Sequence, residues 1–527
     1  MAAVLRPDRA LARNWRLTAW LVAAGAGLGV PLSLAPFNLW PLGMLAVAAH
    51  LLLLRRAEAR RAFALGYWFG VGKYGLGASW VYVSINVYGH AGPALAGALV
   101  VLFVSTLALC NAALAFCWRR WAAAPGWRGD IAFAGAWVLL DMFLTWFLTG
   151  FPWLYLGYGH LHDWLAGFAP VFGVHGVTCA AALCGVALTW VGRDRRALTG
   201  GVLVAGLALG GLLLQQIAWV RPVRSMDVVL VQGNIAQDTK WDEAYVTATL
   251  HTYLTLTAPY WDRALILWPE TAVTMLLDDA GPFLHEVGAR AGAHGGAVVT
   301  GIASWRAEEG IRNLTVVAGN GSGSYVKRHL VPFGEYVPLE GLLRGLIGFL
   351  DLPMSHTTPG APEQPLLRVG RTRIAMAICY EIVYPDLVRG LGAQADLLAT
   401  VSNDSWFGGS IGPLQHMQMA RMRALELGRW LVRATNNGVT GVVDERGEVV
   451  KLLPQFVAAA LPARVWIMAG ATPFARTGSW PIVLLAAVLT AAGAVRRSQR
   501  TPVRERLPGS QISAPKRSRS RSRSRSR

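Results

Sequence analysis

Long apolar runs constrain this chain more than any other feature of its sequence. A transmembrane helix needs about 20 mostly apolar residues, and 54% of the 527 residues are hydrophobic. Eight runs approach or exceed that length: 16–34, 39–54, 62–85, 94–117, 131–149, 164–191, 198–220 and 479–495. We therefore predict a multi-pass helical membrane domain, with seven transmembrane helices in residues 1–222 and an eighth in residues 466–497.

The short loops between these runs alternate in charge. Arginines gather after the second, fourth and sixth runs, whereas loops 35–40, 86–90 and 151–159 contain neither Lys nor Arg. Cytoplasmic loops carry the excess of positive charge in membrane proteins. We predict that both termini are cytoplasmic and that a domain at residues 223–465 lies outside the cytoplasm. In that oxidising space a domain with one cysteine keeps its thiol unpaired.

The segment 498–527 is rich in Arg and ends in Arg-Ser repeats. Such a composition cannot bury a core, so we predict a disordered cytoplasmic tail. Arg-Ser repeats are compatible with nucleic-acid binding, but on a membrane protein we favour attraction to anionic lipid and expect no nucleic-acid partner. Much of the net charge of +19 comes from this tail and from the inside loops, and it says little about a substrate.

Between the seventh and eighth runs, short apolar segments alternate with helical ones. Buried strands are predicted at 226–234, 264–270, 296–302, 313–318, 373–378 and 396–401. Helices are predicted at 241–258, 279–293 and 413–428, the last of them amphipathic, and a hairpin at 438–451. Strands mixed with helices in this way predict sheets covered by helices, an α/β sandwich.

Cys379 is the only cysteine outside the apolar runs, and it directly follows the predicted strand 373–378. It has no disulfide partner in its own domain and no neighbouring set of metal ligands. The spacing of His160, His162 and His416 fits no ligand set either. Because free cysteines are among the most buried residues, Cys379 alone fits either an inert core thiol or a nucleophile.

Two charged residues favour the nucleophile. Glu270 stands at the carboxyl end of the predicted strand 264–270, where open α/β sheets place their sites. Lys327 lies in a segment dense in turn residues. Each alone fits a solvated surface charge. Together, a carboxylate can accept a thiol proton and an ammonium can stabilise an oxyanion, which predicts acyl transfer through a thioester without a metal or cofactor.

The sequences around Glu270, Lys327 and Cys379 resemble the Glu-Lys-Cys triad of the nitrilase, or carbon-nitrogen hydrolase, superfamily. Further segments of the sequence are similar to those of one membrane branch of this superfamily, the apolipoprotein N-acyltransferases. These segments are residues 79–84, 150–153, 231–235, 240–242, 402–408, 412–426 and 433–439. The resemblance covers nearly the whole chain from the first apolar run to the last, and the Arg-Ser tail is a departure from it.

The resemblance implies an αββα nitrilase-like sandwich and a mechanism. Glu270 would take the Cys379 proton, the thiolate would attack an acyl ester of a phospholipid, and Lys327 would steady the oxyanion. The α-amino group of a diacylated apolipoprotein would then accept the acyl chain. The family also implies a multi-pass protein of the bacterial inner membrane with a periplasmic catalytic domain, and we expect a monomer.

Further residues acquire roles from the same resemblance. Glu335 and Glu381 would support the triad, and the backbone N–H of Tyr380 would contribute to an oxyanion hole. Trp241 and Trp406 match family positions on loops over the pocket. The uncharged loop with Phe151 and Trp153 fits the floor of an opening into the outer leaflet, and it fits an aromatic belt equally well.

Two other functions stay open from the sequence. A membrane-tethered amidase would hydrolyse its thioester with water and would share the triad, whereas a receptor for lipoproteins would need no chemistry at all. Seven apolar runs before the domain favour acyl transfer, and retention of all five charged or nucleophilic positions argues against a silent receptor. Lys73 and Asp141 fall inside apolar runs, where an ion is usually paired or functional, and we predict a structural pair or snorkelling to the membrane interface, with no catalytic role.

Overall fold

The computed structural model describes residues 9–192, 195–308, 310–338 and 356–494. The predicted tail at 498–527 lies outside these residues. The described part of residues 9–494 belongs to one compact unit.

Each of the eight apolar runs contains a helix. These are α1 (Arg9–Leu32), α2 (Pro41–Arg55), α3 (Ala59–Gly77), α5 (Pro93–Cys117), α6 (Trp127–Phe143), α7 (Ala169–Leu188), α8 (Arg195–Gln215) and α15 (Trp480–Ala492). Within the described residues, three helical segments are long and apolar enough to cross a membrane: Pro93–Ala122, Ala166–Leu188 and Arg195–Gln215. Leu17–Leu32, α2 and α15 are apolar but shorter. The structure therefore contains membrane-type helices, while the count of eight spans stays a prediction.

Two of the runs end as helices earlier than predicted. The third run breaks after α3, and the chain continues through the short α4 (Trp80–Val83) and the π-helix η1 (Ser84–Tyr88). The fifth run leaves the helix after Phe143, and Leu148, Thr149 and Gly150 adopt positive φ angles. Hydroxyl groups of Tyr380 and Tyr384 bind the carbonyl of Gly150 in the turn after α6, a contact that hydropathy does not register, so hydropathy alone overestimates this helix.

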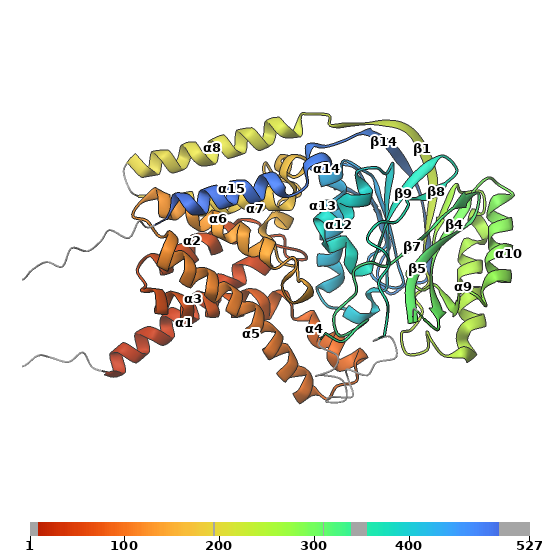
Figure 1. Ribbon diagram of the computed structural model, residues 1–527, viewed down its shortest axis with the longest axis horizontal. Helices are drawn as coiled ribbons and strands as arrows, with labels where there is room; N and C mark the ends of the chain where they lie inside the picture. The colour runs from red at the N-terminus through yellow and green to blue at the C-terminus, as the bar shows by residue number, and fades with distance from the viewer. Residues whose placement is uncertain (1–8, 193–194, 309, 339–355, 495–527) are drawn as a thin grey trace, which may run out of the picture. The chain divides into compact units, whose positions relative to one another are not determined.

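Two sheets face one another in the second half of the chain (Figure 1). The first has the order β14-β1-β2-β4-β5-β7, with β3 paired to β4. Its strands are β1 (Val220–Gln232), β2 (Leu265–Leu267), β3 (Val273–Leu276), β4 (Ala297–Arg306), β5 (Gly310–Gly319), β7 (Ser324–Val326) and β14 (Ala459–Gly470). Strands β1, β2 and β4 are parallel neighbours.

The second sheet has the order β13-β12-β11-β10-β9-β8-β6. Its strands are β6 (Gly321–Ser322), β8 (Leu367–Val369), β9 (Thr372–Ile378), β10 (Leu397–Ser402), β11 (Leu431–Thr435), β12 (Gly441–Val443) and β13 (Val449–Leu452). Strands β9, β10 and β11 are parallel, whereas β12 and β13 form the predicted hairpin. All six predicted strands are therefore confirmed.

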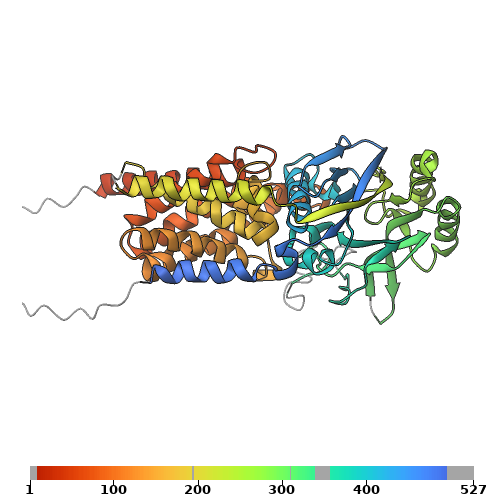
Figure 2. The same ribbon diagram turned by 90° about the horizontal axis from the view of Figure 1, so that it is seen from above.

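Successive side chains of a strand point to opposite faces of its sheet, and this alternation produces the layers. Val228 and Leu230 of β1 pack into the core between the two sheets, whereas Val229 and Val231 face the opposite way. That outer side is covered by α9 (Val246–Thr257) and α10 (Gly281–Gly292). Helices α12 (Pro385–Gly392) and α13 (Gly412–Leu427) cover the other sheet (Figures 1 and 2). The layers are thus helix, sheet, sheet, helix, and the α/β sandwich is confirmed.

Helix α13 differs from its prediction as an amphipathic helix, because nearly all of its side chains are buried. One side packs on the second sheet and the other contacts α7 and α14 (Pro473–Thr477). Its polar side chains bind backbone N–H groups of the apolar region: Gln418 accepts from Ala35 at 2.9 Å and Glu426 accepts from Val174 at 2.6 Å. These polar residues therefore join the sandwich to the apolar helices.

Candidate active site

Cys379 stands at a sharp turn directly after β9. Its φ of +52° lies in the left-handed region, which costs a residue with a side chain about 1–3 kcal/mol and clusters at functional sites. The chain then enters the 3-10 helix Cys379–Val383. The Sγ atom lies 3.3 Å from the hydroxyl of Ser402, the last residue of the neighbouring strand β10.

Glu270 and Lys327 form an ion pair close by. The Nζ atom of Lys327 lies 3.2 Å from Oε1 of Glu270 and 2.8 Å from Oε1 of Glu335. Asn313 donates to the same Oε1 of Glu270 at 2.7 Å. The Lys327 side chain is 1% exposed, so this ammonium is held by two carboxylates away from solvent.

Consecutive residues of the second sheet connect the ion pair to the thiol. Ser402 contacts the Cys379 sulfur, and the backbone N–H of Asn403 donates to Oε2 of Glu270 at 2.8 Å. Glu270 and Lys327 follow strands of the first sheet, whereas Cys379 and Asn403 follow strands of the second. The structure thus brings the three residues of the predicted triad together where the two sheets meet.

The local charges set the protonation states. Burial raises the pKa of Cys379 to about 12, and the negative charge of Glu270 adds to this effect. Burial also disfavours the Glu270 carboxylate, but Lys327 and the Asn313 hydrogen bond outweigh it and hold the pKa of Glu270 below its usual value. The two carboxylates likewise outweigh burial and raise the pKa of Lys327. The resting site therefore contains a thiol, a carboxylate and an ammonium.

Glu335 and Glu381 fix the segment that carries Lys327. Glu335 accepts from the N–H of Val331 at 2.8 Å through its second oxygen. Glu381 is fully buried and accepts from the N–H groups of Arg328 at 2.7 Å and Ile378 at 2.7 Å. One carboxylate therefore joins the residue after Lys327 to the residue before Cys379, and burial raises its pKa above the usual value.

Close backbone packing holds Glu270 in place. A Cβ atom on Gly301 of β4 would lie 2.7 Å from the Cα of Glu270 and 2.4 Å from the backbone nitrogen of Thr271. Real Cβ atoms essentially never come this close to backbone atoms, so only glycine lets β4 approach the turn after β2. This contact fixes the Glu270 backbone against the first sheet.

Lys240 is a second buried cation that the sequence prediction did not include. Its Nζ donates to the backbone carbonyl of Glu270 at 3.1 Å, and burial lowers its pKa to about 8. The neighbouring Trp241 drew attention to this motif, but nothing in the sequence places the ammonium beside Glu270. Asn313, Ser402 and Asn403 were missed as site residues for the same reason, since their contacts arise only when the sheets pack.

His416 belongs to a buried network beside Cys379. Its Nε2 lies 3.1 Å from the carbonyl oxygen of Cys379, and its Nδ1 lies 3.1 Å from Oδ1 of Asp404. Arg433 pairs with the other Asp404 oxygen at 2.8 Å. Within the described residues, no cluster of His, Cys, Asp and Glu side chains has the arrangement of a metal site.

The predicted aromatic residues fall into two groups. Phe151 and Trp153 are 8% and 1% exposed, and the Trp153 indole donates to Gln415 of α13 at 2.6 Å. Their side chains pack the contact with the sandwich instead of lining an open surface. Trp241 is 42% exposed, and Trp406 is half-buried beside Tyr88, with ring centroids 5.9 Å apart.

The loop at 149–150 binds directly to the nucleophile's segment. The hydroxyls of Tyr380 and Tyr384 donate to the carbonyl oxygen of Gly150 at 2.9 Å and 3.1 Å. His329 Nε2 lies 3.1 Å from the carbonyl oxygen of Thr149. The turn after α6, an apolar helix, is thereby tied to the residue next to Cys379.

Two sequence families match the chain in succession. The apolipoprotein N-acyltransferase N-terminal domain matches residues 26–187, and the carbon-nitrogen hydrolase family matches residues 227–471. Among solved structures, yeast Nit3, a member of branch 10 of the nitrilase superfamily, has a TM-score of 0.36 and 16% identity, covering 46% of this chain and 91% of its own. By the family match, residues 227–471 form a carbon-nitrogen hydrolase domain.

Close relatives cover nearly the whole chain. Apolipoprotein N-acyltransferase of Pseudomonas aeruginosa (strain PAO1) is 47% identical, covering 89% of this chain and 94% of its own. The Azotobacter vinelandii enzyme of that name is 46% identical, covering 90% and 95%. The Vibrio cholerae one is 39% identical, covering 89% and 95%. The chain belongs to the apolipoprotein N-acyltransferase family and is an acyltransferase.

Proposed function

We propose that this chain moves an acyl chain from a membrane phospholipid, through a thioester on Cys379, to the α-amino group of a diacylglyceryl-cysteine at the N-terminus of an apolipoprotein. The observation that carries the proposal is the contact of the thiol with Ser402, one residue from the N–H that binds Glu270. A cysteine thiol, a carboxylate base and a fixed ammonium are the groups that such a transfer requires.

Glu270 acts as general base in the first step. Because the pKa of Cys379 lies near 12, little thiolate exists at neutral pH, and the proton moves to Glu270 as sulfur attacks the acyl carbonyl. A carbon–sulfur bond forms, and the carbonyl oxygen becomes an oxyanion that Lys327 stabilises. When the carbon–oxygen bond to glycerol breaks, Glu270 returns the proton to the leaving oxygen. Lysophospholipid departs and the thioester remains.

In the second step the acyl group leaves the sulfur for the acceptor. The neutral α-amino group of the acceptor attacks the thioester carbonyl, and Glu270 takes a proton from that nitrogen. Lys327 again stabilises the oxyanion, and collapse of the intermediate breaks the carbon–sulfur bond. The proton passes back to sulfur, which restores the thiol and leaves an N-acylated lipoprotein. No cofactor takes part.

The remaining predicted residues contact the substrate or hold the catalytic residues in position. Glu335 and Glu381 hold Lys327 and the turn at Cys379, and the Tyr380 N–H is a candidate donor to the oxyanion. Trp241 and Trp406 are candidate contacts for substrate at the open side of the site. Phe151 and Trp153 support the floor below Tyr380, whose ring lies 6.4 Å from that of Trp153 between centroids.

The proposal includes a topology. Seven helices in residues 1–222 and one in residues 466–497 cross the bacterial inner membrane, the domain at 223–465 is periplasmic, both termini and the tail at 498–527 are cytoplasmic, and the protein is a monomer. A membrane domain beside the catalytic site has an energetic advantage. Each CH₂ group exposed to water costs about 0.8 kcal/mol, so a site tied to the loop at 149–150 lets both lipid substrates stay in the bilayer.

The test is a product assay in detergent micelles. We expect the purified chain, given phosphatidylethanolamine and a synthetic diacylglyceryl-cysteine peptide, to produce the N-acylated peptide and lysophospholipid, detected by mass spectrometry. Cys379→Ala abolishes both products, whereas Cys117→Ala, which changes an exposed cysteine at the end of α5, leaves them unchanged. Ammonia release from small amides without peptide acylation would favour the amidase instead.

A further inference from the structure

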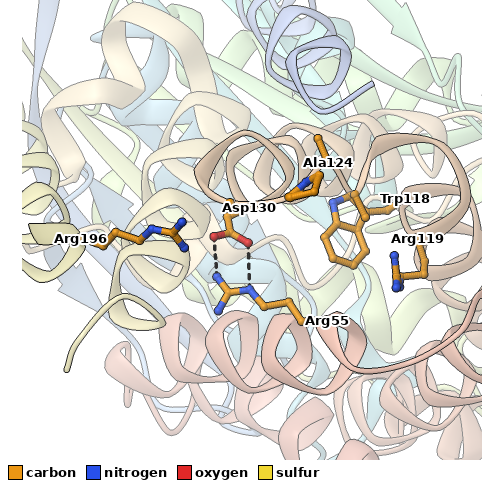
Figure 3. A pocket seen from close by; sticks show the side chains of 9 residues that line it. Arg55, Trp118, Arg119, Ala124, Asp130 and Arg196 are labelled. Carbon is orange, nitrogen blue, oxygen red and sulfur yellow. Dashed lines mark hydrogen bonds and ion pairs between the residues drawn. The ribbon is translucent and has the colours of Figure 1, made fainter. Parts of the chain in front are cut away.

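A basic pocket opens where the ends of four apolar helices meet (Figure 3). Its volume is about 290 Å³. Arg55 ends α2, Arg119 lies in the π-helix Trp118–Ala122 after α5, Gly126 precedes α6, and Arg196 lies in the first turn of α8. Helix α6 runs from this pocket to the turn that binds Tyr380, so the pocket lies at the opposite end of α6 from the active site.

The charges in this pocket are unbalanced. Asp130 neutralises Arg55 in a two-bond contact of 2.9 Å and 2.7 Å, and Trp190 donates to the same carboxylate at 2.8 Å. Within the described residues, no ion pair joins a carboxylate to Arg119 or Arg196, and Arg119 donates to the carbonyl of Ala57. Two guanidinium groups therefore remain for an anion, and guanidinium groups bind phosphate well because their donors form a planar fork.

The start of α6 adds to this preference. Gly126 supplies no side-chain cap to the helix, so the first backbone N–H groups have no partner of that kind. The N-terminus of a helix favours negative charge. A Cβ atom on Gly126 would lie 3.4 Å from a guanidinium nitrogen of Arg196, so this arginine lies over the start of α6.

An apolar groove begins beside the same pocket. It has a volume of about 620 Å³, lies between α5, α6 and α15, and is lined by side chains that include Leu109, Ala113, Leu140 and Phe143. Trp118 lines both the groove and the basic pocket. From Thr106 to Cys117 the groove follows α5 for about 16 Å at 1.5 Å per residue, about the depth of one leaflet of a hydrocarbon core about 30 Å thick.

We propose that the pocket and groove together bind one anionic phospholipid, apart from the lipid consumed in the reaction. Its phosphate binds in the pocket at the start of α6, where Arg119 and Arg196 supply the positive charge that no carboxylate pairs, and its acyl chains lie along α5 and α6. A soluble phosphate ester would fill the pocket but would leave the groove exposed. In the proposed topology these arginines face the cytoplasm, where basic pockets between transmembrane helices bind anionic head groups.

The test measures lipid binding to the full-length chain by native mass spectrometry in a mild detergent. The probe is diether phosphatidylglycerol, which has no acyl ester and so cannot acylate Cys379. We expect the double variant Arg119→Gln, Arg196→Gln to weaken binding at least tenfold and Arg196→Gln alone to weaken it at least threefold. Arg60→Gln, which changes an exposed arginine outside the pocket, is the matched control and should bind as the wild type does.

A second variant tests the groove separately. Ala113→Trp fills part of the groove without touching an arginine, and we expect it to weaken lipid binding at least threefold. Glycerol 3-phosphate at the same concentration should not displace the lipid. Unchanged binding in Arg196→Gln and in the double variant would overturn the proposal, as would displacement by glycerol 3-phosphate. Peptide acylation by these variants is read separately, so failure here leaves the proposed reaction untouched.

Discussion

Two buried lysines of this molecule each face a carboxylate, and they do so differently. Lys327 lies 3.2 Å and 2.8 Å from two glutamates, and both oxygens of Glu270 accept further hydrogen bonds. Lys73 of α3 lies 3.8 Å from Asp141 of α6. In the described structure neither its Nζ nor the Asp141 oxygens has a hydrogen bond. Instead Lys73 lies 5.1 Å and 5.4 Å from the ring centroids of Tyr74 and Trp137.

We expect this difference between a proposed catalytic site and a pair that only holds helices together. Hydrogen bonds hold both carboxylate oxygens of Glu270 and the ammonium of Lys327, so the positions of these charges are fixed before any substrate binds. The Lys73 pair has only charge attraction and aromatic faces, which tolerate small shifts of the helices. Both pairs are expensive to break, because removing one partner leaves an unpaired charge in a low dielectric.

The largest effect is expected at the ordered pair. Glu270→Gln removes the base, and we expect the rate of peptide acylation to fall about 10³-fold, within the usual range for general acid–base catalysis. Glu286→Gln, at an exposed glutamate of α10, is the control and should retain full activity. A Glu270→Gln enzyme within tenfold of the wild type would show that another group takes the proton.

The Lys73 and Asp141 pair, which has no hydrogen bonds, should affect the stability of the protein and not the rate of the reaction. Lys73→Met leaves Asp141 unpaired, and we expect a loss of about 3 kcal/mol of stability, measured as a lower thermal unfolding midpoint in detergent. The double variant Lys73→Met, Asp141→Leu removes both charges and should regain most of that loss. Activity of the folded fraction should stay within twofold of the wild type. A large loss of activity in a stable double variant would contradict a purely structural role.

A smaller effect is expected at Ser402, which lies 3.3 Å from the sulfur and 2.5 Å from Oδ1 of Asp404. Ser402→Ala removes the link from the thiol to the Asp404 network, and we expect acylation to slow about tenfold, or roughly 1.4 kcal/mol. The initial rate of lysophospholipid release measures this step. Ser322→Ala, at an exposed position of β6, is the control. Wild-type rates in Ser402→Ala would show that the thiol needs no such partner.

The smallest effect concerns pH. Lys327 holds the pKa of Glu270 below its usual value, so the base is lost only as pH falls through that lowered pKa. We expect the single-turnover rate of enzyme acylation to change less than twofold between pH 7 and pH 6, a range that lies below the pKa of about 8 of Lys240. The second half-reaction is not a fair test, because the acceptor amine itself titrates near pH 8. An acid limb between pH 6 and pH 7 would mean that Glu270 is not stabilised as a carboxylate.

The sequence predicted most of what local patterns determine. Apolar runs bounded by turn residues located the strands, and the positions of Glu270 and Cys379 after such runs indicated the site before any packing was known. Contacts across the two sheets left no such signal. Lys240 and Asn403 lie in segments that carry the family resemblance, but neither they nor Asn313 show along the chain that they contact Glu270, because only the facing sheets bring them there.

The apolar helices show the same limit. Hydropathy located a helix in each run, but it could not foresee that the carbonyl groups of Thr149 and Gly150 would bind side chains from the sandwich and end the fifth run early. Hydropathy also could not show that Trp153 would be buried. A tryptophan at a predicted membrane interface can belong to an aromatic belt or pack inside the protein, and the sequence looks the same in both cases.

The central claim is that Cys379 carries the acyl chain. Incubation of the purified protein with acyl-labelled phospholipid, without acceptor, should place one acyl group on the peptide that contains Cys379, as detected by mass spectrometry. Hydroxylamine should release it, and addition of the diacylglyceryl-cysteine peptide should discharge it at the rate of product formation. Transfer that proceeds in Cys379→Ala, or a label that stays on the protein when acceptor is added, would contradict the account.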